Sequence, residues 1–201
     1  MDATEKIIRQ ELRLTTSSFE RFSSLLQAGI HFTNIRNGET IGAFLNKLPG
    51  FNMNYIRDRV QTIFLNGTAI DDLETPLAGA QPVLAISSAM PGLAGSIFRK
   101  NSLHATLRSS AKKNALKTDM PGTTTVTLKL FNVIARERGA ELLHGGCTIK
   151  VKDLVKFLQA RPPLLSSMTE VFLNGEMLRP GDIITRLAGT EEIKLTIREA
   201  A

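Results

Sequence analysis

The residues IFLNG at positions 63–67 recur as VFLNG at positions 171–175. Before each copy, apolar residues follow the spacing of one helix face, and the tripeptide LAG follows each copy, at 77–79 and 187–189. The helix stripes are Ile41, Phe44, Leu45 and Leu48 in the first copy, and Val151, Leu154, Val155 and Leu158 in the second. Because the stripe and LAG both repeat at a spacing of 110 residues, we predict two copies of one structural unit.

Each copy contains the same predicted elements in the same order: strand, short helical or loop excursion, strand, helix, strand and strand. In the second copy these begin with the alternating segment 123–131, the excursion 135–146 and the strand 147–151. The helix 152–160 is expected to stop before Pro162, and the Asn-Gly pair favours a tight turn. Because one amphipathic helix must bury its apolar face against a sheet, the order predicts an α+β fold of tandem β-grasp (ubiquitin-like) domains.

The predicted boundaries are a first domain at 1–95, a basic linker at 96–121 and a second domain at 122–201. The net charge of +6 comes from the linker, which carries no acid between positions 96 and 118. Its bases are Arg99, Lys100, Arg108, Lys112, Lys113 and Lys117. Leu103, Leu107 and Ala111 recur at helical spacing, so the linker can be partly helical and bind a partner groove, an anionic membrane or nucleic acid. A solvated linker is the alternative, and the lack of interleaved aromatic residues disfavours nucleic acid.

The composition indicates a cytoplasmic protein. Cys147 is the single cysteine, which excludes a disulfide framework, and the first ten residues hold no apolar run typical of a secretion signal. The charge-free window 75–98 has the length of a membrane span, but its prolines and glycines disfavour such a helix. Since the repeat also predicts a strand in its first half, no membrane span is expected.

Four segments of the second copy carry a resemblance to a known family: VTLKLFNVIARERG, TIKVKDLVKFL, VFLNGEML and ITRLAGTEEIKLTI. Together they resemble the ubiquitin-like sulfur carriers, namely the small subunit of molybdopterin synthase and the carrier of thiamine thiazole synthesis. The resemblance covers nearly all of 123–201 and, more loosely, 7–95. It implies protein partners such as an E1-like activating enzyme, a cofactor-synthesis subunit or a metal-cofactor enzyme.

The chemical end of the family pattern is missing. Family members carry sulfur on a terminal Gly-Gly carboxylate, whereas Ala200 and Ala201 stand at that place after Glu199. The first copy has a tail of similar character at Met90, Pro91, Gly92, Leu93 and Gly95, but the chain continues beyond it. Either a protease exposes an activatable end near Gly92 or Gly95, which makes the chain a carrier precursor, or the tail is a tether into the linker.

Other candidate sites are better explained as structure. His144 and Cys147 have a spacing found in metal sites, but a closed zinc site needs four ligands, and Cys147 is expected in the core. Asp71, Asp72 and Glu74 are expected to form a solvated turn rather than an acid-base pair. No catalytic residue, cofactor or metal is therefore predicted. The expected function is non-catalytic binding or scaffolding through the sheet face opposite the helix and the tail at 92–95, with a sulfur-carrier precursor and a nucleic-acid-associated module as alternatives.

Overall fold

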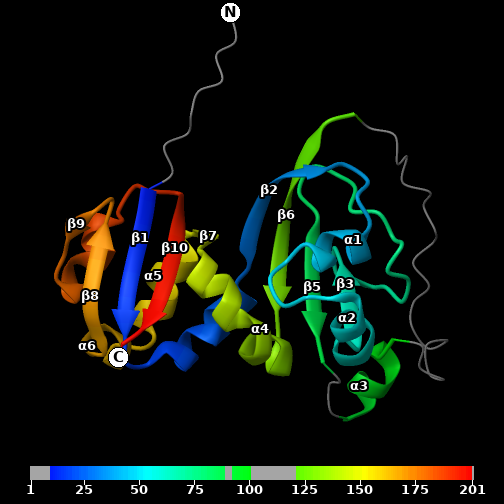
Figure 1. Ribbon diagram of the computed structural model, residues 1–201, viewed down its shortest axis with the longest axis horizontal. Helices are drawn as coiled ribbons and strands as arrows, with labels where there is room; N and C mark the ends of the chain where they lie inside the picture. The colour runs from blue at the N-terminus through cyan, green and yellow to red at the C-terminus, as the bar shows by residue number, and fades with distance from the viewer. Residues whose placement is uncertain (1–9, 89–91, 101–120, 201) are drawn as a thin grey trace, which may run out of the picture. The chain divides into compact units, whose positions relative to one another are not determined.

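The computed structural model describes residues 10–88, 92–100 and 121–200 (Figure 1). Its strands are β1 Gln10–Thr16, β2 Ile30–Arg36, β3 Thr62–Leu65, β4 Thr68–Ala69, β5 Val83–Ser87, β6 Thr123–Leu130, β7 Cys147–Lys150, β8 Met168–Leu173, β9 Glu176–Met177 and β10 Glu192–Glu199. Its helices are η1 Phe19–Gln27, α1 Ile41–Asn46, α2 Met53–Arg59, α3 Gly92–Phe98, α4 Asn132–Gly145, α5 Val151–Gln159, α6 Pro163–Ser166, η3 Pro180–Asp182 and α7 Ile183–Arg186. The η segments are 3₁₀ helices.

The chain divides into two compact units. Unit 2 is the continuous stretch Phe22–Leu142, and unit 1 combines the residues up to Arg21 with those from Leu143 onward. Each unit pairs parallel and antiparallel strands and carries helices, so the predicted α+β class is confirmed. The division falls within η1 and α4, whereas the repeat predicted boundaries at the linker 96–121.

The sheet of unit 2 runs in the order β4-β3-β5-β6-β2 (Figure 1). Strand β6 lies between β5, to which it is parallel, and β2, to which it is antiparallel. Leu128 of β6 is opposite Leu84 and Ile30, and all three side chains are fully buried. The first strand of the second copy therefore supplies the middle of the sheet formed by the first copy.

The sheet of unit 1 runs in the order β7-β10-β1-β8-β9. Strand β1 lies parallel to β10 and antiparallel to β8. Leu14 of β1 is opposite Ile197 and Val171, with at most 1% of each of the three residues exposed. The first strand of the chain thus pairs with strands that follow it by more than 150 residues.

Two asparagines at equivalent places in the repeat show where the exchanged strand sits. Asn66 and Asn174 both adopt positive φ, at 51° and 53°, and each begins the turn that its glycine completes. The Asn66 side-chain oxygen accepts from the Val83 N–H at 2.8 Å, and that of Asn174 accepts from the Glu11 N–H at 2.8 Å. Strand β1 therefore occupies in unit 1 the place that β5 occupies in unit 2.

The glycines that lead into β2 and β7 show which strand lies next to each of these two strands. A Cβ on Gly29 would lie 2.7 Å from Cγ2 of Thr127 in β6, and a Cβ on Gly146 would lie 2.9 Å from Oγ1 of Thr196 in β10. Strand β6 in unit 2 and β10 in unit 1 therefore hold equivalent places. The units share one sheet plan, but their strands come from different parts of the repeat.

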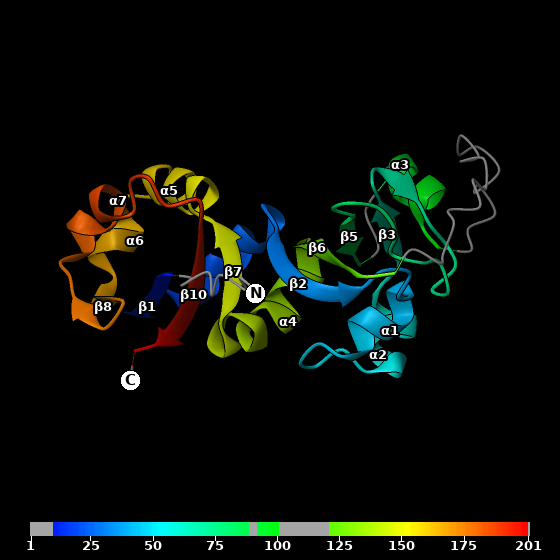
Figure 2. The same cartoon turned by 90° about the horizontal axis from the view of Figure 1, so that it is seen from above.

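Helices α5, α6 and α7 lie on one face of the sheet of unit 1, and α1 and α2 lie on one face of the sheet of unit 2 (Figure 2). In unit 2, Thr40 caps α1 by accepting from the Ala43 N–H, and Asn52 caps α2 by accepting from the Tyr55 N–H. In unit 1, α5 begins at Val151 and ends at Gln159, before Pro162, as predicted. The helix α2 was not predicted, and it extends the helical layer of unit 2.

Replacing Gly29 by alanine is expected to destabilise unit 2 by about 1–3 kcal/mol. Gly29 has φ +122°, where an L-residue is strained, and the added Cβ would also meet Thr127. Gly79 is a matched control, because its φ is +111° and nothing lies within 4 Å of the place that a Cβ would take. Chemical denaturation should show a larger loss for Gly29→Ala than for Gly79→Ala. Equal losses would mean that β6 does not lie against Gly29.

Within the described ranges, no helix is long and apolar enough to cross a membrane. The first half of the charge-free window contains β5, as the repeat predicts, and its end contains α3.

Candidate interaction surface

Helix α3, the next described element after β5, packs on the sheet of unit 2. Helix α3 lies on the face of this sheet away from α1 and α2 (Figure 2). Phe64 of β3 points to that face, because its neighbours Ile63 and Leu65 point into the core. The rings of Phe64 and Phe98 are 5.3 Å apart and tilted by 55°. An aromatic contact therefore fixes the end of α3 on the sheet.

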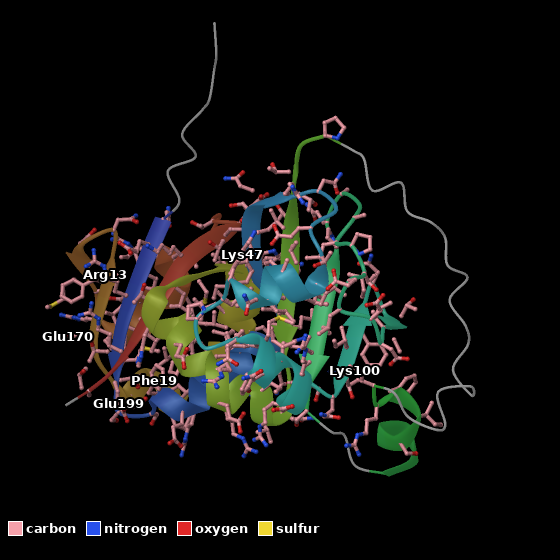
Figure 3. The ribbon with its side chains drawn as sticks, turned by 45° about the vertical axis from the view of Figure 1, so that its right-hand side comes forward. Arg13, Phe19, Lys47, Lys100, Glu170 and Glu199 are labelled. Carbon is pink, nitrogen blue, oxygen red and sulfur yellow. The ribbon has the colours of Figure 1, made fainter. Side chains whose placement is uncertain are left out.

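Lys100 anchors the residues that follow α3 (Figure 3). Its ammonium donates to the carbonyl oxygens of Val60 at 3.0 Å and Arg57 at 3.3 Å, at the carboxyl end of α2. A cation at this end of a helix is favoured by the helix dipole. The backbone N–H of Lys100 also donates to the backbone carbonyl oxygen of Gln61 at 2.6 Å. Burial lowers the pKa of Lys100, with Asp58 and Asp71 acting in the opposite direction.

The residues proposed from sequence as tail and linker fall into three groups. Gly92, Leu93 and Gly95 lie in α3, so this part of the tail is helical. Arg99 and Lys100 follow α3, and the Arg99 Nε donates to the Gln61 side-chain oxygen at 3.1 Å. Met90, Pro91, Arg108, Lys112, Lys113 and Lys117 lie outside the described residues.

The sheet of unit 1 has a face opposite α5, α6 and α7 (Figure 2), and its side chains include those of Arg13 and Glu170 (Figure 3). We call this surface the open face of unit 1; it includes Arg13, Thr15, Glu170, Phe172 and Met177. Phe172 is half-buried and lies opposite both Arg13 and Met177 on the neighbouring strands. Met177 is 66% exposed, the one large hydrophobic side chain so exposed among the described residues. An exposed methionine beside an aromatic ring is a surface that a partner can cover.

Charged groups surround the apolar part of the open face. Arg13 pairs with Glu11 at 3.2 Å, and the Thr15 hydroxyl donates to Glu170 at 3.0 Å. Glu170 forms no ion pair in the part of the chain that the structure describes. Its carboxylate is therefore open to a cation from a partner.

The end of β10 is held in the sheet of unit 1. The Ala200 N–H donates to the Thr16 carbonyl oxygen at 3.0 Å, beyond the last paired residues, Thr16 and Glu199. Ala200, one of the two positions where the resemblance implies a glycine, thus lies beside a strand.

A polar cluster joins α2 to α4 within unit 2. The Tyr55 hydroxyl donates to Glu137 at 2.8 Å, and Arg59 also donates to that carboxylate. The guanidinium of Arg138 lies 4.0 Å from the centre of the Tyr55 ring. The hydrogen bond from Arg59, and to a smaller extent that from the Tyr55 hydroxyl, lowers the pKa of Glu137. Burial is the main cause that raises the pKa of Tyr55, and the hydrogen bond to Glu137 adds to it. Because Tyr55 and Arg59 of α2 both donate to the carboxylate of Glu137 in α4, the cluster links the two helices.

Glu137→Gln is expected to reduce the stability of unit 2 at neutral pH by about 0.5–1 kcal/mol, because it weakens the charge-assisted hydrogen bonds from Tyr55 and Arg59, and solvent screens the exposed Arg59 pair. A lowered carboxyl pKa means that this stability is present above the ordinary value of 4.5 and is lost as pH falls through the folded-state value. Denaturant titrations should therefore show a difference between wild type and variant at pH 7 that shrinks toward pH 3. A difference that stays constant would show that the ionised carboxylate is not what braces α2.

The other candidates from sequence have structural explanations. Cys147 is buried as predicted, and burial raises the pKa of its thiol to about 12. His144 stacks on Phe19 with ring centres 4.6 Å apart. Asp71, Asp72 and Glu74 are exposed, and Asp72 accepts from the Glu74 N–H, which confirms the predicted turn. Among the residues that the structure describes, no three metal-ligating side chains gather.

The sequence patterns did not predict the docking of α3 or the exposure of Met177. The sequence Phe98-Arg99-Lys100 could have indicated this docking. Phe98 is the one aromatic residue between positions 82 and 100, and an aromatic side chain usually packs against other apolar side chains. Met177 lies two residues after Asn174-Gly175, where the first copy has Ala69. That difference between the copies marks the open face of unit 1.

Comparison with protein-family models, curated proteins and solved structures found no match. The open face of unit 1 is therefore a candidate on the basis of its own residues and their geometry alone.

Proposed function

We propose that the chain is a non-catalytic binding or scaffold protein of the sulfur-carrier β-grasp superfamily, acting in the cytoplasm. Two tandem β-grasp domains, each of which takes the first strand of the other copy, account for the repeat and for the strand order of unit 2. In unit 1 the incoming β1 lies between β8 and β10, so that β10 takes the place that β6 has in unit 2. The single observation that carries the binding role is the open face of unit 1, where Met177 is 66% exposed beside the half-buried Phe172. A protein partner, such as an E1-like enzyme, a cofactor-synthesis subunit or a metal-cofactor enzyme, would cover this face.

Two features favour binding over sulfur transfer. Ala200 is tied to Thr16, and Gly92 and Gly95 lie in a helix whose Phe98 packs on Phe64. A protease needs an extended and accessible segment, so the docked α3 disfavours cleavage near Gly92 or Gly95. Mass spectrometry of the intact protein from its native cell should find no product that ends near Gly92 or Gly95. A fragment that ends near either glycine would support the carrier precursor instead.

The binding role is tested by capturing partners with the full chain as bait, followed by quantitative mass spectrometry. Met177→Glu should reduce the recovery of specific partners at least tenfold, because it places a charge where an apolar contact is required. Lys152→Glu is the matched control, since Lys152 is exposed on α5, on the other side of the sheet. Equal recovery with both variants would refute the open face of unit 1 as the binding surface.

A further inference from the structure

The two copies place an aromatic ring at the same position, and only the surroundings differ. Phe64 and Phe172 both lie two residues before the turn asparagine and point away from the core. Phe64 packs against Phe98 at 5.3 Å. Phe172 makes no ring contact within the described ranges, and its neighbour Met177 is exposed. Unit 2 therefore carries its own occupant at a place that unit 1 leaves open.

The occupant of unit 2 has a definite chemistry. It is a short helix that ends in an aromatic residue and is followed directly by two bases. Phe98 packs on Phe64, and Arg99 and Lys100 then reach Gln61 through the Arg99 side chain and the Lys100 N–H. The bases thus lie toward the beginning of β3.

The position in β8 that corresponds to the first residue of β3 carries an acid. By the repeat, Thr62 corresponds to Glu170, and Gln61 corresponds to Thr169. Glu170 is exposed, two residues from Phe172 on the same face, and forms no ion pair among the described residues. In unit 2 the basic residues that follow the aromatic anchor meet Gln61; in unit 1 a carboxylate, that of Glu170, lies one position further along the strand, on the same face as Phe172.

We propose that the open face of unit 1 binds a short helix of a partner protein, in which an aromatic residue packs on Phe172 and Met177 and the following bases pair with Glu170. This inference rests on the proposed binding function and names the class of partner. Helix α3 of a second copy is a less suitable occupant, because it already packs on Phe64 of its own chain. A short helix buries few side chains against a sheet face. The aromatic residue is the largest of them, so we expect it to supply most of the binding energy.

The probe is the peptide GLAGSIFRK, residues 92–100, with both ends blocked to remove terminal charges. Titrated into the isotope-labelled full chain, it should shift the amide resonances of Phe172 and Met177 saturably in NMR spectra. A peptide with Phe98→Ala should bind at least tenfold more weakly, since it lacks the anchor. A peptide with Arg99→Glu and Lys100→Glu should bind severalfold more weakly, and Glu170→Gln in the chain should remove that difference.

Matched variants of the chain locate the binding site. Met177→Ser, at a side chain that is 66% exposed, should weaken binding without loss of fold, and Phe172→Ala should weaken it further. Phe64→Ala is the control, and it should leave the shifts at Phe172 unchanged. The absence of saturable shifts at Phe172, or shifts confined to the surroundings of Phe64, would overturn the proposal.

This experiment separates the inference from the proposed function. If the peptide fails to bind while Met177→Glu still abolishes capture of native partners, the open face is a binding surface for a different class of partner, and the helix proposal is wrong. If Met177→Glu leaves capture unchanged, the proposed function itself fails.

Discussion

Leu128→Ala is expected to loosen the sheet of unit 2 although Leu128 belongs to the second copy of the repeat. Its side chain is fully buried and lies between Leu84 and Ile30. Removing a buried leucine side chain costs about 2–5 kcal/mol, through lost burial and the cavity that remains. Amide hydrogen exchange under native conditions should therefore speed up in β2 and β5, the two strands that flank β6.

The same experiment distinguishes the exchanged arrangement from separate domains. If each copy formed its own sheet, the loss of protection would fall on β7 and β10, which belong to the second copy. Lys129→Ala is the control on the same strand, because Lys129 alternates with the buried Leu128 and Leu130. It should change stability by no more than about 0.5 kcal/mol. Faster exchange confined to β7 and β10 in Leu128→Ala would refute the pairing of β6.

Leu14→Ala is expected to have the reciprocal effect on unit 1. Leu14 is 1% exposed and lies opposite Ile197 and Val171, so the expected cost is again about 2–5 kcal/mol. Protection should fall in β8 and β10 and remain in β2 and β5. Arg13→Ala is the matched control on the open face, since its side chain is 56% exposed. Loss of protection in β2 and β5 would mean that β1 pairs within its own copy.

Local structure could be predicted from the sequence because short-range signals determine it. The turns at Asn66-Gly67 and Asn174-Gly175 have the predicted positive φ, and α5 stops before Pro162 as expected. The alternation at 123–131 gives β6, and the final strand of each copy is present. Each of these depends on residues only a few positions apart.

The partner of each first strand could not be predicted. Leu12-Arg13-Leu14 and Leu128-Lys129-Leu130 share one alternation of apolar and basic residues, so either segment satisfies a buried central strand. The choice is made by long-range packing, such as the contact of Asn174 with Glu11. In a duplicated sequence the first strands of the two copies have the same pattern, so the pattern does not indicate which sheet each strand joins.

The helix α3 was missed for a related reason. Gly92 and Gly95 disfavour a helix, and the sequence predicts a tail at this place that is either cleaved or a tether into the linker. Contacts distant in sequence offset that preference, since Phe98 packs on Phe64 and Lys100 binds the end of α2. The same segment explains why unit 2 has an occupied face and supplies the probe for unit 1.

The most direct test of the exchanged strands is a chain that can be cut in the linker. A protease site inserted between Lys112 and Lys113, outside the described residues, separates a fragment with β1 to β5 from one with β6 to β10. Because β6 lies within the sheet of unit 2 and β1 within that of unit 1, the cut fragments should elute together under native conditions and separate only in denaturant. Two folded fragments that separate without denaturant would contradict the account.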